Sequence, residues 1–600
     1  MTSIDEIFQK SGIPSKRKLE PIRDPTEIYK SAKLSSTANR HARVDDDQAD
    51  TEAGPLPPTD GDDDEADYGP SAPPPEGNDE EEPGDDEEGR FFGGGISRTE
   101  REILDFVDTT TTGDSAIPAD GEETIDLAWL KRTALAFEKK ITRNAELRAR
   151  HAQEPTKFID SEADLDAAIK ALSILSEHPG LYPDFARLGC VGSLVSLLAH
   201  ENTDIAIDAV EIIGELTDED VAASDEQWSA LVDAMLEADL LGLLVSNFGR
   251  LDESQEADRE GVYRALGVVE NLCSKPETAE VVGADEALLK WLLDRAGRAE
   301  KPVGQNKQYA AEILAILVQS STKNRRKLVE LDAVDAMLQL VSVYRKRDPE
   351  KGGDEEEYME NLFEALTSIA DEPEGKAKFV EAEGVELCLI MLKEGKLSKP
   401  AALRLLDHAA GGSAGTGVCQ KIVEAGGLKT TFTMFMKKLD HRTTEHLLGI
   451  FASLLRLLPA DSAERIRTLS KFVEKGYEKI EKLVKLRREY AGMMKAVDER
   501  IMEEQKEMSE DEREEMADEW FSRRLDAGLF CLQTIDVILA WLIAEDDGAR
   551  KKIQTLLADR GETFAVIKET IQEQIDGIDA ESAEAQETKE MLTTLVQFLE

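Results

Sequence analysis

Four glutamates at related positions are the first candidates for chemistry in this sequence. Glu211 and Glu215 lie four residues apart, and Glu312 and Glu364 occur in later segments of similar pattern. Residues four apart share one face of a helix. Carboxylates on one face can accept charge-assisted hydrogen bonds from Lys and Arg side chains. The spacing therefore predicts an acidic path for a basic peptide.

Three polar residues extend this path. Asn271, Ser368 and His408 align with Glu215, and we expect Asn271 to bond to the backbone of a bound peptide. The alternative is that these side chains belong to ordinary solvated helix faces. Exposed Glu is common, and 33% of the chain is charged.

Enzyme and metal signals are weak. The run Gly411–Gly417 is rich in glycine, but no Gly-Lys-Ser/Thr follows it, so we interpret it as a loop between helices. His441, Glu445 and His446 do not match a His-Glu-x-x-His zinc helix, because two histidines five residues apart face different sides. We expect no catalytic residue, metal or cofactor. A nucleotide-using enzyme is the lowest-ranked alternative.

Helices must position these residues, since strand signals are almost absent after residue 95 and apolar residues recur at three- and four-residue steps. From about residue 160, a turn rich in Gly, Ala and acid precedes an apolar helix, a polar gap and a second apolar helix. The steps between equivalent positions are 49, 46, 48, 51 and 43 residues, counted along Val191, Leu240, Glu286, Val334, Val385 and Leu428.

Such periods are typical of armadillo and HEAT repeats, which stack into one continuous core with a concave surface. We predict an all-α, right-handed superhelical solenoid of armadillo type whose last helix in each unit lines the groove. Peptide-binding armadillo proteins typically hold Trp and Asn there, whereas Glu replaces Trp in three of five units here. The expected parts are a disordered tail (1–98), a helical cap (99–159), the repeats (160–465) and long, then capping, helices (466–600).

Composition narrows the range of partners. The 600 residues carry a formal net charge of −53, which disfavours direct binding of nucleic acid and favours basic partners.

The most apolar stretch, 525–544, contains Asp and Gln residues, so we expect a buried helix and no membrane span. The five scattered cysteines fit a reducing compartment. Residues 44–89 hold 20 Asp and Glu and no Lys or Arg, and this predicts disorder.

Several segments carry a more specific resemblance. The chain resembles the beta-catenin-like family of nuclear armadillo-repeat proteins, which are associated with the spliceosome, from about Leu127 to the C-terminus. The matching segments are Asn202–Asp204, Glu215–Asp218, Arg250–Ser254, Glu330–Asp332, Met359–Phe363, Leu405–Ala409 and, most specifically, Arg523–Phe530.

The resemblance implies a non-enzymatic scaffold of the complex of pre-mRNA-processing factor 19 and cell division cycle 5-like protein. It also implies binding of basic nuclear-localisation segments, including those of cell division cycle 5-like protein and pre-mRNA-processing factor 31. The basic cluster Lys16-Arg17-Lys18 is the candidate import signal. The alternative is a transport adaptor of importin-alpha type, which would need a strongly basic arm for importin-beta. A homodimer is a further open alternative.

Overall fold

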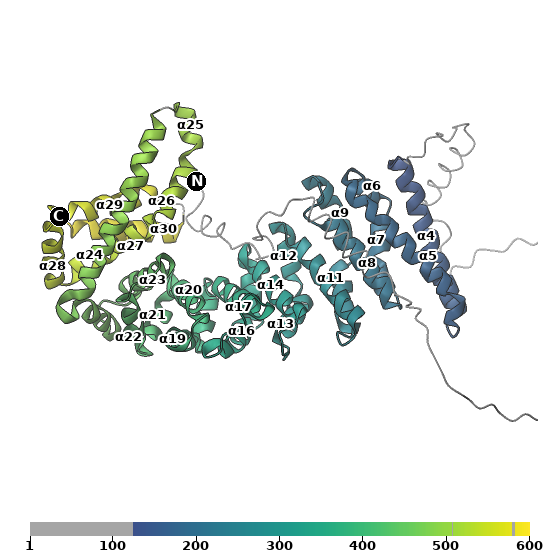
Figure 1. Cartoon of the computed structure of the whole chain (residues 1–600), viewed down its shortest axis with the longest axis horizontal. Coiled ribbons are helices and arrows are strands. Elements are labelled where there is room, and N and C mark those ends of the chain that lie inside the picture. The colour runs from purple at the N-terminus through teal and green to yellow at the C-terminus, as the bar shows by residue number, and fades with distance from the viewer. Residues whose placement is uncertain (1–123, 507, 579–581) are drawn as a thin grey trace, which may run out of the picture. The chain divides into compact units, whose positions relative to one another are not determined.

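The computed structural model describes residues 124–506, 508–578 and 582–600, and within them every regular element is a helix (Figure 1). The predicted tail and the basic cluster Lys16-Arg17-Lys18 lie outside the described residues. The described part starts with α4 (Leu127–Arg150), whose N-terminus is capped by the side chain of Asp126. This helix packs on α5 (Ile159–Lys170). The predicted all-α fold is therefore confirmed for this part of the chain.

Six units of three helices follow. Their first helices are α6 (Tyr182–Arg187), α9 (Asp225–Glu237), α12 (Pro276–Ala284), α15 (Thr322–Glu330), α18 (Pro373–Glu381) and α21 (Thr416–Glu424). Their second helices are α7 (Cys190–Ser196), α10 (Leu240–Arg250), α13 (Glu286–Gly297), α16 (Ala333–Val341), α19 (Gly384–Glu394) and α22 (Gly427–Phe435). Their third helices are α8 (Thr203–Thr217), α11 (Glu256–Leu272), α14 (Gln305–Gln319), α17 (Asp354–Ile369), α20 (Ser398–Ala410) and α23 (His441–Leu457).

The turn before each second helix explains the repeat spacing seen in the sequence. All six positions used for that spacing are the first or second residue of a second helix. In five units the preceding residue has a left-handed backbone with φ between 55° and 75°, namely Gly189, Asp239, Asp332, Glu383 and Gly426. In the remaining unit, Asp285 has φ −75° and instead caps α13 by accepting a hydrogen bond from the Leu288 amide at 2.8 Å.

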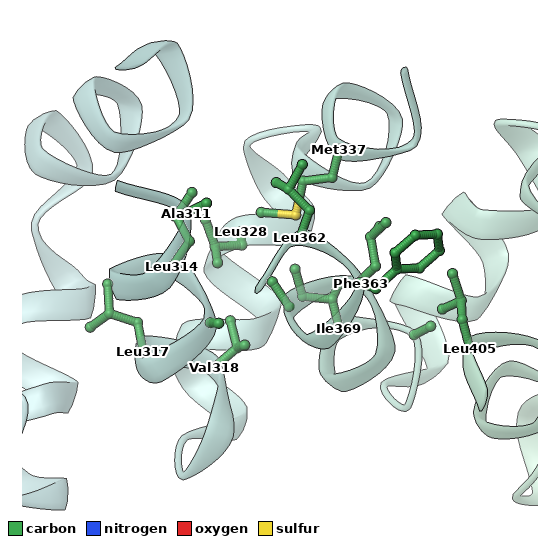
Figure 2. Close-up of a cluster of buried hydrophobic side chains, with 14 of the residues drawn as sticks. Ala311, Leu314, Leu317, Val318, Leu328, Met337, Leu362, Phe363, Ile369 and Leu405 are labelled. Carbon is green, nitrogen blue, oxygen red and sulfur yellow. The ribbon is translucent and has the colours of Figure 1, made fainter. Parts of the chain in front are cut away.

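The third helices form the central layer of the stack. Each contacts the next along the series α8, α11, α14, α17, α20 and α23, and α23 continues the series by contacting α27 (Leu529–Glu545) (Figure 1). Each unit thus buries its apolar residues against its neighbours, which is how repeat proteins acquire a continuous core. Figure 2 shows part of this core, where Phe363 of α17 points toward Leu405 of α20.

The C-terminal region is also helical. The long α24 (Ala463–Gln505) loses helical backbone geometry at Glu474–Tyr477, and the chain continues through α25 (Glu510–Glu515) and α26 (Ala517–Asp526) to α27. The last three helices are α28 (Asp547–Ala558), α29 (Ala565–Gly577) and α30 (Ala583–Gln597). A buried ion pair joins α24 to α27, because Arg487 Nε donates to Asp536 Oδ1 at 2.7 Å.

The apolar stretch around 525–544 forms most of α27, whose side chains are largely buried among α23, α24, α28 and α29. No single helix among the described residues is long and apolar enough to cross a membrane. The segments Glu512–Asp526 and Leu529–Glu545 reach the required length and composition only as a pair, with a bend of 62° between them.

Candidate peptide-binding face

All seven residues predicted to bind a peptide lie on third helices. We call the sides of α8, α11, α14, α17 and α20 that carry them the third-helix face. The residues are Glu211 and Glu215 on α8, Asn271 on α11, Glu312 on α14, Glu364 and Ser368 on α17, and His408 on α20. The third helices are neighbours in the stack, so the fold places residues that are almost 200 positions apart in sequence on one series of helices.

The two glutamates of α8 already have partners within the protein. Glu211 pairs with Arg264 of α11, and Arg264 also lies 3.4 Å from Glu260. Glu215 accepts a hydrogen bond from the Ser173 hydroxyl at 2.5 Å. Both glutamates are half-buried. An incoming basic side chain would therefore compete with Arg264 for Glu211, whereas Glu215 faces only a neutral donor in this arrangement.

Asn271 joins two repeats. Its side-chain nitrogen donates to the Gly214 carbonyl at 3.0 Å and to the Thr217 hydroxyl at 3.2 Å, both on α8. With its nitrogen engaged in these bonds, Asn271 could meet a peptide backbone only through its side-chain carbonyl, which accepts from an N–H. The predicted bond from Asn271 to a peptide backbone stays a prediction, with the side-chain oxygen as its acceptor.

Glu312 lies deeper than the sequence suggested. Its exposed fraction is only 6%, and it accepts a hydrogen bond from Gln308 Nε2 at 2.9 Å. The reason is its place on α14, which is packed between α11 and α17. Buried polar groups need a partner, and Gln308 supplies one. Glu312 therefore contributes to the packing of α14 and is poorly placed to meet a peptide in solution.

Glu364 is the carboxylate best suited to receive a cation. It is half-buried and accepts a hydrogen bond from the neutral amide of Gln319 at 3.2 Å. Burial raises the pKa of Glu364 above its usual value, and the nearby Arg404 only partly opposes this shift. Ser368, one turn further along α17, is also half-buried.

His408 belongs to a polar cluster at the α20 end of the face. Its Nδ1 lies 3.1 Å from Asp371 Oδ2, and its backbone carbonyl accepts a hydrogen bond from Lys376 Nζ at 2.7 Å. Burial disfavours the charged imidazole, but the hydrogen bond and charge of Asp371 outweigh it, so the pKa of His408 is raised. This histidine is bonded to Asp371 as an ion-pair partner.

Aromatic residues on this face were missed by the sequence reasoning. The rings of Tyr263 on α11 and Tyr309 on α14 lie 5.0 Å apart, and the Tyr309 hydroxyl donates to Glu270. Gly267 makes room for this hydroxyl, because a Cβ on Gly267 would lie 3.4 Å from it. The sequence reasoning looked for Trp at Gly267 and Glu312. It overlooked the Tyr that lies one helical turn before each of them, which could have indicated this pair of rings.

The glycine-rich run connects α20 to α21, as interpreted from the sequence, and it contains the short 3-10 helix Ser413–Gly415. Within it, the Ser413 amide donates to Glu584 Oε1 of α30 at 3.0 Å. A carboxylate of the protein thus already accepts the hydrogen bond that this backbone amide would have to donate to a bound phosphate. His446 faces Asp407 at 3.0 Å, and His441 lies next to Tyr490, so the two histidines point to different neighbours.

Six three-helix units with a stacked layer of third helices define an armadillo-type repeat protein. Residues 101–572 match the family described as "Catenin-beta-like, Arm-motif containing nuclear". The chain therefore belongs to this family of armadillo-repeat scaffolds, whose description is nuclear.

Curated relatives agree with this assignment. The beta-catenin-like protein 1 homolog of Schizosaccharomyces pombe is 37% identical over 506 residues, which cover 84% of this chain and 87% of that protein. Beta-catenin-like protein 1 of Homo sapiens is 38% identical over 484 residues, covering 78% of this chain and 85% of that protein.

Likenesses to solved structures are more distant. An engineered protein has a TM-score of 0.44 at 16% identity, over 72% of this chain and 95% of its own length. A designed armadillo repeat protein has a TM-score of 0.34 at 17% identity, over 44% of this chain and 99% of its own length.

Proposed function

We propose that this protein is a nuclear docking scaffold in pre-mRNA splicing that binds Lys/Arg-rich segments of splicing factors on its third-helix face. The proposed partners are cell division cycle 5-like protein and pre-mRNA-processing factor 31, within the complex that also contains pre-mRNA-processing factor 19. Membership in a nuclear Arm-motif family supports the location and the scaffold role. The net charge of −53 supports basic partners.

The state of Glu364 carries the proposal. This carboxylate is partly removed from water, and its hydrogen-bond donor is a neutral amide. A carboxylate in such a place gains more from an added cation than one in open water, because the local dielectric is lower. Glu360 lies one turn before Glu364 on α17, and its charge contributes to the raised pKa of Glu364. A Lys or Arg of a peptide would offset the repulsion between the two.

The remaining residues have secondary roles in this proposal. Glu215 offers a second carboxylate without a basic partner in its hydrogen bond, and Glu211 can exchange Arg264 for a peptide side chain. Asn271 can accept one backbone N–H through its side-chain carbonyl. Glu312 is assigned to packing because it is buried.

The test is a titration of the full chain with a fluorescent Lys/Arg-rich peptide from the cell division cycle 5-like protein. The Glu364→Gln variant should bind about five-fold more weakly, because loss of one partly exposed ion pair costs about 1 kcal/mol. Binding to the unmodified chain should also weaken in high salt, since exposed charges are screened beyond about 8 Å at physiological ionic strength.

The matched control is Glu569→Gln, which removes an exposed carboxylate from α29, away from the third helices. It should leave peptide affinity unchanged. Equal weakening in both variants would mean that only the overall charge matters. Affinity that changes with neither salt nor Glu364→Gln would remove the third-helix face as the binding site.

A further inference from the structure

Two helices that are distant in sequence, α23 and α27, meet at one cluster of potential metal ligands. His441 is the first residue of α23, and Glu445 lies one turn later on the same helix. Cys531 comes from the start of α27, 90 positions from His441. The ligand atoms of these three side chains all lie within 4.8 Å of one another.

The imidazole is oriented toward the centre of this cluster. His441 Nδ1 lies 3.7 Å from Cys531 Sγ and 3.1 Å from the hydroxyl of Tyr490 on α24. Nδ1 therefore lies beside both the hydroxyl and the thiol, and in the tautomer that carries its proton on Nε2 the Nδ1 lone pair faces them. That lone pair is the one that a metal ion would use.

The distances suit a small tetrahedral ion. Zinc bonds to sulfur at about 2.3 Å and to nitrogen at about 2.0–2.1 Å, which places neighbouring N and S ligands about 3.5 Å apart. The observed N–S separation of 3.7 Å is close to this value. A His, a Cys and a carboxylate are the ligand types that zinc prefers, and the Tyr490 hydroxyl or a water can take the fourth position.

Burial differs between the ligands in a way that allows entry of an ion. Cys531 is a free and fully buried thiol, whereas His441 is exposed and Glu445 is half-buried. Gly528, with φ +95°, allows the Tyr490 ring to pack close against the backbone beside the cluster. A Cβ there would lie 2.4 Å from the Tyr490 ring and 3.6 Å from His441.

We propose that His441, Glu445 and Cys531 bind one divalent transition-metal ion, and that this ion is zinc in the cell. The ion replaces the thiol proton of Cys531, which leaves to solvent, and the sulfur then binds as a thiolate. Because the ligands come from α23 and α27, the bound ion links the last three-helix unit to the C-terminal helices. The proposal is independent of peptide binding on the third-helix face.

Cobalt titration of the full chain, purified under reducing conditions and freed of metal with a chelator, tests this site. Co²⁺ bound to a thiolate produces a charge-transfer absorption in the near ultraviolet that oxygen ligands alone do not give. We expect this absorption to saturate at one equivalent and to disappear when zinc is added. Its absence from the unmodified chain would overturn the proposal.

Two variants and one control locate the ligands. Cys531→Ser should abolish the absorption, and His441→Gln, a change at an exposed residue, should weaken metal affinity at least ten-fold. The control Cys388→Ser removes another fully buried thiol, on α19, and should leave the absorption intact. Circular dichroism confirms that each variant remains helical. Absorption that persists in folded Cys531→Ser, or an unchanged affinity in His441→Gln, would refute the assignment.

Discussion

The buried ion pair between Arg487 and Asp536 should respond very differently to losing one partner and to losing both. Asp536 is fully buried, and its Oδ1 accepts a hydrogen bond from Arg487 Nε. Burial raises the pKa of Asp536 from 3.8 to about 6, despite the opposing charge of Arg487. A shift of this size corresponds to about 3 kcal/mol that the ionised form costs the folded state at neutral pH.

The single variant Arg487→Met should therefore lose about 3–5 kcal/mol, because it leaves a buried carboxylate without its cation. The double variant Arg487→Met with Asp536→Leu should return to within about 1 kcal/mol of the unmodified chain, or exceed its stability, since both charges are then gone. The two changes should thus be strongly coupled.

The pH dependence follows from the direction of the pKa shift. A raised carboxyl pKa favours the folded state while the group is protonated. Its contribution is fully present below pH 3.8 and is lost as the pH rises through about 6. The unmodified chain should therefore lose more stability between pH 4 and 7 than the double variant does.

Hydrogen exchange at the amides of α27 measures the free energy of local opening in each variant, without requiring the whole chain to unfold in one step. If the losses in Arg487→Met and in the single variant Asp536→Leu simply add in the double variant, the pair is not coupled and this reasoning fails. An identical pH dependence in the unmodified chain and the double variant would likewise contradict the assignment of the titration to Asp536.

Three further predictions concern the repeats. Glu383→Gly should raise stability by about 0.5–1 kcal/mol in thermal melts, because relief of the left-handed strain at φ 59° exceeds the entropic cost of glycine. Phe363→Ala should destabilise the stack by about 3–5 kcal/mol through the cavity that it leaves beside α20, whereas a loss below 1 kcal/mol would mean that the site collapses freely. Asn271→Ala should cost about 1–3 kcal/mol, as faster hydrogen exchange in α8 and α11 would show, because it removes the bonds to Gly214 and Thr217.

The repeat architecture could be predicted from the sequence because it depends on local signals. A turn residue followed by an apolar helix recurs in every unit, and this marked the start of all six second helices. Even the exception at Asp285 follows a local rule, since an Asp at a helix N-cap replaces the left-handed turn.

The state of each side chain on the third-helix face could not be predicted in the same way. Periodicity placed Glu312 and Glu364 on equivalent positions, but only the packing of neighbouring helices buries the first and leaves the second half-exposed. Likewise, Asn271 bonds to α8, across a gap of 57 residues from Gly214. The meeting of His441 with Cys531 depends on the path of α24 between them, which no spacing rule describes.

The contact between α23 and α27 has a consequence for solubility. In a stack of repeats, the last unit exposes the apolar side that would otherwise be buried against the next unit. Here α27 packs against α23 in the place that the third helix of a further unit would take. The C-terminal helices thus cap the stack of repeats. A chain shortened after residue 460 should therefore polymerise end to end or precipitate.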